Sequence, residues 1–193
     1  MGVELFNKVL GIVGVGQIGS HLTKLAQGIG MRVIAYDPYL AADRAEKMGV
    51  EMAGLSELFR RADIISVHTP LTPETKNLIN AQSIATMKPG VMIVNCARGG
   101  IIHEGDLHEA LKSKRVAAAA FDVFEEEPPP VDHPFFGLDN VVITPHAAYH
   151  SEEAIGTVRR FAAEEVVRVL TGQAPWSPVN AGELVEAHWA VSR

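Results

Sequence analysis

The chain has 193 residues, enough for about one domain with a sizeable buried core. Its composition, 47% hydrophobic and 21% charged, is that of a globular protein, and a net charge of −6 argues against nucleic acid as a direct partner. No apolar run approaches the roughly 18 residues that span a bilayer, no signal peptide is visible, and a single cysteine cannot form an internal disulfide. We therefore expect a cytoplasmic protein without membrane contact.

The N-terminal part of the chain predicts a strand, a glycine-rich turn, a helix and a second strand. The strands are the apolar runs 9–13 and 31–36. One face of the helical pattern between them carries four apolar side chains, Leu22, Leu25, Ala26 and Ile29. The turn has the spacing Gly14-x-Gly16-x-x-Gly19, and its position between strand and helix is typical of dinucleotide-binding proteins.

Each glycine of this turn has a distinct role in such a protein. Gly14 permits the tight turn, Gly16 lets a pyrophosphate approach the backbone, and Gly19 lets the helix pack close to the strand. The helix N-terminus then offers unpaired N–H groups to the phosphates. An ordinary βαβ turn that happens to contain glycines is the alternative interpretation.

Asp37 ends the second strand, eighteen positions after Gly19. Its carboxylate can accept hydrogen bonds from both ribose hydroxyls of an adenosine and would repel a 2′-phosphate. Because Pro38 and Tyr39 supply no compensating cation, the sequence favours NAD over NADP.

The rest of the chain alternates short apolar runs with amphipathic segments, which predicts an α/β fold with a doubly wound parallel sheet. We expect further strands at 50–52, 63–68, 91–95, 116–123 and 141–144. We expect further helices at 41–48, 55–61 (starting at Gly54 or Ser56), 79–87, 104–113 and 151–170. The predicted organisation is one nucleotide-binding domain over residues 1–173 and a tail over 174–193.

Polar and titratable side chains recur where the predicted strands end. These positions are Gly14–Gly19, Asp37, His68–Pro70, Cys96–Arg98, Asp122–Glu127 and Pro145–His146. Since ligands bind beyond the carboxyl ends of parallel strands, the pattern predicts a site at this edge independently of the glycine motif.

Several blocks of the sequence resemble the D-isomer-specific 2-hydroxyacid dehydrogenases. They are Val67–Thr75 (VHTPLTPET), Asn95–Gly100 (NCARGG), Phe121–Pro128 (FDVFEEEP) and Thr144–His146 (TPH). With the glycine turn, the resemblance covers almost all of residues 4–180. It implies a Rossmann-type NAD-binding domain of an oxidoreductase that transfers a hydride between NAD(H) and a 2-hydroxy or 2-keto acid.

The resemblance also implies catalytic roles for three residues. His146 would be the general acid, because imidazole titrates near working pH. Glu127, chosen from the acidic run because it precedes Pro128, would pair with His146 and fix its orientation. Arg98 would bind the substrate carboxylate and polarise the carbonyl. A solvated strand end for Arg98 and a merely charged loop for Glu125–Glu127 are the alternatives.

The cofactor would contact further residues of these blocks. The resemblance places the nicotinamide end at Asp122 and the pyrophosphate at the backbone of Gln17 and Ile18. The other expected contacts are Pro38, His68, Thr69, Pro70, Thr75, Cys96, Ala97, Arg98, His146 and Ala148. For His68 a capping or core role is the alternative, and Cys96 is expected to be a small neighbour of NAD, since no base is placed to activate it. No metal is expected, because the pair His146 and His150 lacks a third ligand.

Two segments, His146–Glu152 and His188–Ala190, further resemble the corepressor subgroup called C-terminal binding proteins. Ala147–Ala148 replaces the glycine pair of most members, so phosphoglycerate dehydrogenase is expected to be a less close match. Family members have a second, substrate lobe, which we expect to be largely missing here, with 174–193 a remnant of its return segment. The alternative function is an NAD(H)-binding regulatory module without catalysis. A homodimer is expected, and we expect the remaining histidines to be surface or packing residues: His21, His103, His108, His133 and His188.

Overall fold

The computed structural model describes residues 2–178 of the chain. Two compact units form, Met1–Ala148 and Tyr149–Arg193. The expected boundary after residue 173 stays a prediction, and His188–Ala190 lies outside the described residues. Within the described part, no helix combines the length and apolar character needed to cross a membrane.

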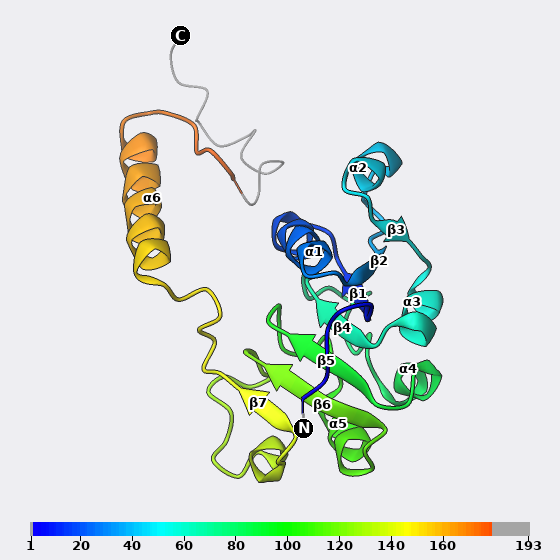
Figure 1. Cartoon of the computed structure of the whole chain (residues 1–193). Helices are drawn as coiled ribbons and strands as arrows, with labels where there is room; N and C mark the ends of the chain where they lie inside the picture. The colour runs from blue at the N-terminus through cyan, green and yellow to red at the C-terminus, as the bar shows by residue number, and fades with distance from the viewer. Residues whose placement is uncertain (1, 179–193) are drawn as a thin grey trace. The chain divides into compact units, whose positions relative to one another are not determined.

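The first unit is built on a seven-stranded parallel sheet with the order β3-β2-β1-β4-β5-β6-β7 (Figure 1). The strands are β1 (Val9–Val13), β2 (Arg32–Tyr36), β3 (Glu51–Met52), β4 (Ile64–Val67), β5 (Val91–Asn95), β6 (Val116–Phe121) and β7 (Val141–Ile143). The chain runs outward from β1 to β3 and then returns to place β4 beside β1. This reversal is the switch point at which open α/β sheets bind ligands, and it confirms the predicted doubly wound fold.

Helices follow the strands in the expected alternation. They are α1 (Gln17–Gly28), α2 (Ala42–Lys47), α3 (Leu55–Arg61), α4 (Ala81–Thr86) and α5 (Glu104–Lys112). Gly54, rather than Ser56, is the N-cap of α3. The helix α4 starts later than expected because the Asn80 side chain accepts a hydrogen bond from Ser83 N and caps it. A short 3₁₀ helix, η1 (Pro134–Gly137), was not expected.

Two hydrophobic clusters cover the two faces of the sheet, and β1 contributes to both. Val9 and Val13 belong to the larger cluster, which includes side chains of α3, α4 and α5. Leu10 and Ile12 belong to the smaller one, which includes Ala26 of α1. Successive side chains of a strand point to opposite faces, so this buried strand needs apolar residues throughout.

The predicted inner face of α1 is partly wrong. Leu25 is 57% exposed and Ile29 is 55% exposed. Ala26 is buried and Leu22 is partly buried, as predicted, but the other buried positions of α1 are Gly19 and Thr23. Small side chains let α1 lie close to the sheet, and the Thr23 hydroxyl donates to the carbonyl of Gly19. The prediction from hydrophobic periodicity placed the larger apolar residues Leu25 and Ile29 on the buried face, whereas they are exposed.

In the second unit, α6 (Glu152–Leu170) has the predicted extent. Ser151 caps it by accepting a hydrogen bond from Ala154 N at 3.0 Å. Gly172, with φ of +77°, follows its end as expected for a C-terminal cap.

Candidate active and nucleotide-binding site

The glycine turn lies between β1 and α1, at the switch point of the sheet. Gly14 has φ of +96°, and a Cβ there would lie 2.8 Å from the backbone of His68. A Cβ on Gly19 would lie 2.2 Å from the carbonyl oxygen of Gly14. At Gly16 a Cβ would meet no described atom within 4 Å. The fold itself therefore requires Gly14 and Gly19, whereas Gly16 leaves the turn open toward a ligand.

A cavity of about 280 Å³ lies beside this turn. Eight of the predicted cofactor contacts line it: Gly14, Gly16, Asp37, Pro38, His68, Thr69, Pro70 and Thr75. Its wall is shaped by loop contacts, since the Thr75 hydroxyl donates to the carbonyl of Pro70 at 2.7 Å. A second cavity is lined by Gln17 and Ile18 together with His68.

The Asp37 carboxylate is fixed by two backbone donors. Its Oδ2 accepts from Val15 N at 2.8 Å, and its Oδ1 accepts from Tyr39 N at 2.8 Å. Each carboxylate oxygen can accept a further hydrogen bond, so both remain available to ribose hydroxyls. The contact with Val15 also ties the end of β2 to the glycine turn.

His68 lies between the two cavities, directly after β4. Its Nε2 is 2.8 Å from the Ser66 hydroxyl. Burial disfavours the charged imidazolium and lowers the pKa of His68 from its ordinary value of 6.5. A neutral His68 is therefore part of the cavity wall.

This lowered pKa predicts a pH-dependent stability. Between the lowered pKa and 6.5 the unfolded chain binds more protons than the folded one, so stability rises with pH. We expect the free energy of unfolding to fall as pH drops from about 7 through this window, and to fall less in His68→Gln. Urea unfolding of both proteins across the window is the measurement. Parallel pH profiles would contradict the assignment.

The NCARGG turn follows β5 and is held by Asn95, a buried residue that was not singled out from the sequence. Asn95 Oδ1 accepts from Ala97 N at 3.0 Å, and its amide donates to the carbonyl of Arg98 at 2.9 Å. Arg98 is exposed, and its guanidinium donates to the carbonyl of Ala97 at 2.6 Å. The turn is thus shaped by a polar residue at the end of an apolar strand, which is the signal that could have identified Asn95.

The NCARGG turn also touches the acidic loop directly. A Cβ on Gly99 would lie 1.8 Å from the carbonyl oxygen of Phe124. Only a glycine allows this approach of two backbones. The turn that carries Arg98 and the loop that carries Glu127 are therefore fixed relative to each other.

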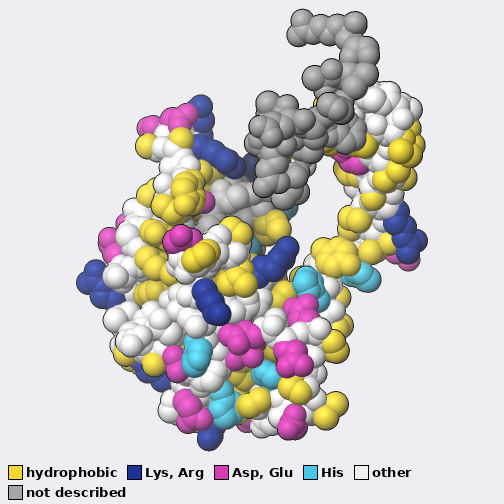
Figure 2. All heavy atoms as spheres, turned by 180° about the vertical axis from the view of Figure 1, so that it is seen from behind, with side chains coloured by type: hydrophobic (Ala, Val, Ile, Leu, Met, Phe, Trp, Pro, Cys, Tyr) yellow, Lys and Arg dark blue, Asp and Glu magenta, His cyan; other side chains and the backbone are white. Residues whose placement is uncertain are grey.

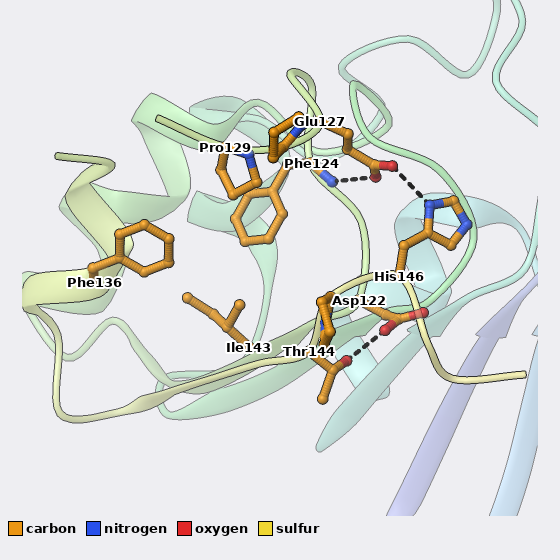
Figure 3. Close-up of a pocket in the computed structure, with 10 residues that line it drawn as sticks. Asp122, Phe124, Glu127, Pro129, Phe136, Ile143, Thr144 and His146 are labelled. Atoms are coloured by element: carbon orange, nitrogen blue, oxygen red, sulfur yellow. Dashed lines mark hydrogen bonds and ion pairs between the residues drawn. The ribbon is translucent and has the colours of Figure 1, made fainter. Parts of the chain in front are cut away.

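His146 and Glu127 form a hydrogen-bonded pair at the carboxyl edge of the sheet (Figure 3). His146 Nδ1 lies 2.7 Å from Glu127 Oε2. The other oxygen, Oε1, accepts from Phe124 N at 3.0 Å. The hydrogen bonds from His146 and Phe124 hold the pKa of Glu127 below its ordinary value of 4.5. Of the three consecutive glutamates, Glu127 is the one that faces His146.

Asp122 anchors the turn on which His146 lies. This carboxylate is 2% exposed and accepts from the Thr144 hydroxyl at 2.5 Å, Ala147 N at 2.7 Å and Ala148 N at 2.9 Å. Burial opposes its charge, but the hydrogen bonds outweigh burial and lower the pKa of Asp122. The bonds support an unusual backbone, since His146 has φ of +52°. Asp122 thus has a structural task that the sequence did not indicate.

An apolar cavity of about 540 Å³ opens beside the His146–Glu127 pair (Figure 3). Its lining combines the polar residues Asp122, Glu127, Thr144 and His146 with Phe124, Pro128, Pro129, Phe136, Ile143 and Pro145. At Cys96, burial raises the pKa of the thiol, and Asp122 raises it further. A protonated thiol fits a small neighbour of a ligand better than a nucleophile.

The structure thus brings together His146, Glu127 and Asp122 at one edge, and the glycine turn, Asp37 and His68 at the switch point. The guanidinium of Arg98 bonds its own turn instead of this pair. Among the described residues no group of histidine, cysteine and acidic side chains could hold a metal ion. The arrangement is that of a dinucleotide-binding domain with a paired histidine at its ligand edge.

Comparison with known proteins identifies the family. Residues 1–148 match the family described as D-isomer specific 2-hydroxyacid dehydrogenase, NAD binding domain. The chain belongs to this family.

Named relatives and solved structures agree with this identification. The chain is 48% identical over 180 residues to a D-3-phosphoglycerate dehydrogenase of Methanocaldococcus jannaschii, covering 93% of this chain and 34% of that protein. It is 45% identical over 194 residues to the Bacillus subtilis enzyme of the same name, covering 98% and 36%. A crystal structure of D-lactate dehydrogenase with NAD⁺ from Lactobacillus jensenii superimposes with a TM-score of 0.84 at 29% identity, covering 93% and 57%. The chain spans about a third of the length of these curated relatives.

These relatives correct one expectation. Ala147–Ala148 led us to expect phosphoglycerate dehydrogenases as a less close match than the corepressor subgroup. The named relatives are phosphoglycerate dehydrogenases, so two alanines at this position are compatible with that group. The preference for the corepressor subgroup is not supported.

Proposed function

We propose that the chain is the NAD-binding domain of an oxidoreductase that transfers a hydride between NAD(H) and a 2-hydroxy or 2-keto acid. The observation that carries this proposal is the hydrogen-bonded pair of His146 and Glu127, with 2.7 Å between Nδ1 and Oε2, at the same sheet edge as the glycine turn. A binding domain alone would not need a histidine fixed in this way. Turnover requires the substrate lobe of a longer protein.

The residues present fit NAD. The open side of Gly16 and the N-terminus of α1 would meet the pyrophosphate, and the two free lone-pair positions of Asp37 would meet the adenosine ribose. His68, Thr69 and Pro70 would form a wall of the adenosine end. When bound, NADH supplies the hydride for the carbonyl carbon.

The chain's own residues would supply the proton and the electrostatics. His146 Nδ1 is engaged by Glu127, so Nε2 is left to donate a proton to the substrate oxygen. Such a general acid contributes about 10²–10⁴ in rate. Arg98 would exchange its bond to Ala97 for the substrate carboxylate, a planar fork matched to a planar anion. Asp122 would hold the His146 turn while it meets the nicotinamide end.

We propose a homodimer in the cytoplasm as the state of the complete protein, on the basis of the family resemblance. Sedimentation of the chain over a range of concentrations tests the first part. A species of 20.8 kDa at every concentration would contradict pairing through this part of the chain.

Asp37 gives a direct test of the cofactor assignment. In Asp37→Asn one amide oxygen can still accept from Val15 N, but the charge and one acceptor are lost. We expect NADH to bind about tenfold more weakly, since a hydrogen bond to a charged group contributes about 1.5 kcal/mol or more. The measurement is calorimetric titration of NADH into wild type and variant. Equal affinities would show that Asp37 does not contact the ribose.

One observation favours a second candidate, an NAD(H)-binding regulatory module. The Arg98 guanidinium donates its hydrogen bond to the backbone carbonyl of its neighbour Ala97. Supplying the substrate lobe of a relative and measuring NADH oxidation with a panel of 2-keto acids separates the two. Turnover supports the oxidoreductase, and NADH binding without turnover supports the module.

A further inference from the structure

The acidic loop that carries Glu127 is held from its other side by a second pair, Glu104 and His133. Glu104 begins α5, and His133 precedes η1. Glu104 Oε2 lies 3.1 Å from His133 Nε2. Glu104 Oε1 accepts from the backbone N–H of Glu125 at 2.9 Å. One carboxylate therefore joins a helix, a buried histidine and the acidic loop.

The hydrogen bonds fix the protonation pattern of His133. Its Nδ1 accepts a hydrogen bond from Phe135 N at 3.3 Å. The ring hydrogen is therefore on Nε2, which donates a hydrogen bond to Glu104. The imidazole is 9% exposed and lies edge-on to Phe124, with 5.0 Å between ring centroids. A buried, doubly bonded histidine of this kind is a rigid support for the aromatic side chain beside it.

These contacts lead in two steps to Glu127. The ring of Phe124 packs on His133, and the backbone N–H of Phe124 donates a hydrogen bond to Glu127 Oε1 at 3.0 Å. Glu125, whose N–H is bound by Glu104, lies two residues before Glu127. Gly99 contacts the Phe124 carbonyl from the NCARGG turn. The backbone of the loop is thus held at Phe124 and Glu125, and the carboxylate of Glu127, two residues further on, faces His146.

The surface around this pair is rich in titratable groups that have other partners. In Figure 2, histidine and acidic side chains are interspersed over the lower part of the view. His103 pairs with Asp106 at 3.1 Å, and His108 pairs with Glu109 at 3.0 Å. Both histidines line a cavity of about 280 Å³ with Glu104, Glu125 and His133. Of these three pairs in the described part of the chain, Glu104–His133 is the one whose carboxylate also accepts a hydrogen bond from the acidic loop.

We propose that Glu104 and His133 are positioning residues that hold the acidic loop in the one conformation in which Glu127 pairs with His146. This inference rests on the proposed function, because the pair acts only through the His146–Glu127 couple. It assigns a task to one of the histidines that we had expected to be a packing or surface residue.

The test measures the pKa of Glu127, which depends on its two hydrogen bonds, and it does not require catalytic turnover. The bond to His146 is the largest cause of the lowered pKa of Glu127, followed by the bond from Phe124 N. NMR titration of the Glu127 carboxyl carbon in the whole chain measures this pKa. In Glu104→Ala we expect it to rise toward 4.5, because the loop is released and both bonds weaken. In Glu104→Gln, whose amide oxygen can still accept from Glu125 N, the rise should be smaller.

Asp106→Ala is the matched control. Asp106 also lies in the first turn of α5, and its carboxylate accepts from Ala81 N at 2.7 Å, away from the acidic loop. It should leave the Glu127 titration unchanged. If Glu104→Ala does not fold, the Glu127 pKa is measured in Glu104→Gln and His133→Asn instead. The asparagine of His133→Asn keeps an acceptor for Phe135 N but lacks the Nε2–H that donates to Glu104.

A Glu127 titration identical to wild type in the folded Glu104 and His133 variants would overturn the proposal. So would an equal shift in Asp106→Ala, because the effect would then be general destabilisation. Calorimetry with NADH on the same samples separates this outcome from failure of the proposed function. A chain that binds no NADH contradicts the function whichever way Glu127 titrates.

Discussion

Replacing His146 by asparagine is expected to lower kcat by about 10²–10⁴-fold once the substrate lobe is supplied, with NADH affinity retained. The asparagine amide can take the place of the imidazole Nδ1–H against Glu127, so the acidic loop keeps its partner. What is lost is the proton at Nε2. Steady-state oxidation of NADH by a 2-keto acid gives kcat, and titration of NADH gives the affinity.

The control for this variant is His150→Asn, four residues further along the chain, where the imidazole lies edge-on to Tyr149. It should leave kcat within about twofold of wild type. A His146→Asn enzyme with wild-type kcat would remove His146 from the reaction and leave its hydrogen bond to Glu127 as a structural feature.

Gly99→Ala is expected to give the largest loss of stability among substitutions that add one methyl group in the site. The added Cβ would lie 1.8 Å from the carbonyl oxygen of Phe124 and 2.6 Å from the backbone nitrogen of Glu125. Backbone atoms cannot turn away as a flexible side chain can, so the NCARGG turn and the acidic loop must separate. We expect a loss of about 3 kcal/mol in the free energy of unfolding, the upper part of the range for overpacked sites.

Denaturant unfolding of Gly99→Ala measures this loss, with Gly105→Ala as its control. Gly105 lies in α5, where a Cβ would meet only ordinary contacts with the His103 ring at 3.5 Å. Alanine is favoured over glycine inside a helix by about 0.5–1 kcal/mol, so the control should be neutral or more stable. Equal stabilities for the two variants would show that the turn and the loop are not in backbone contact.

Sequence patterns were sufficient for the architecture because the central strands, such as β1, β4 and β5, are short apolar runs. The strands β1 and β5 have the predicted bounds, and the order of β-strands and α-helices follows the prediction, with the short 3₁₀ helix η1 as an unexpected addition. The glycine spacing was informative for the same reason: Gly14 and Gly19 are needed by steric contacts of the backbone within one βαβ unit. Short-range steric constraints of this kind can be recognised from residues that are close together in the sequence.

The remainder depends on contacts between distant segments. No periodicity distinguishes Glu127 from Glu125, and the loop that carries both lies against Gly99, 28 positions before Glu127 in sequence. The clamp at Asp122 depends on Thr144 and the backbone beyond it. For α1, the sheet selected small residues over the larger apolar ones that the helical pattern suggested. Such choices are made by tertiary packing and cannot be read from one segment.

A calorimetric titration of the wild-type chain with NADH, alongside NADPH, tests the cofactor assignment most directly. We predict one NADH site per chain and weaker binding of NADPH, because the Asp37 carboxylate, oriented by Val15 N and Tyr39 N, would repel a 2′-phosphate. The absence of NADH binding would contradict the assignment of the glycine turn and its cavity as a cofactor site. Equal binding of NADPH would contradict the role of Asp37.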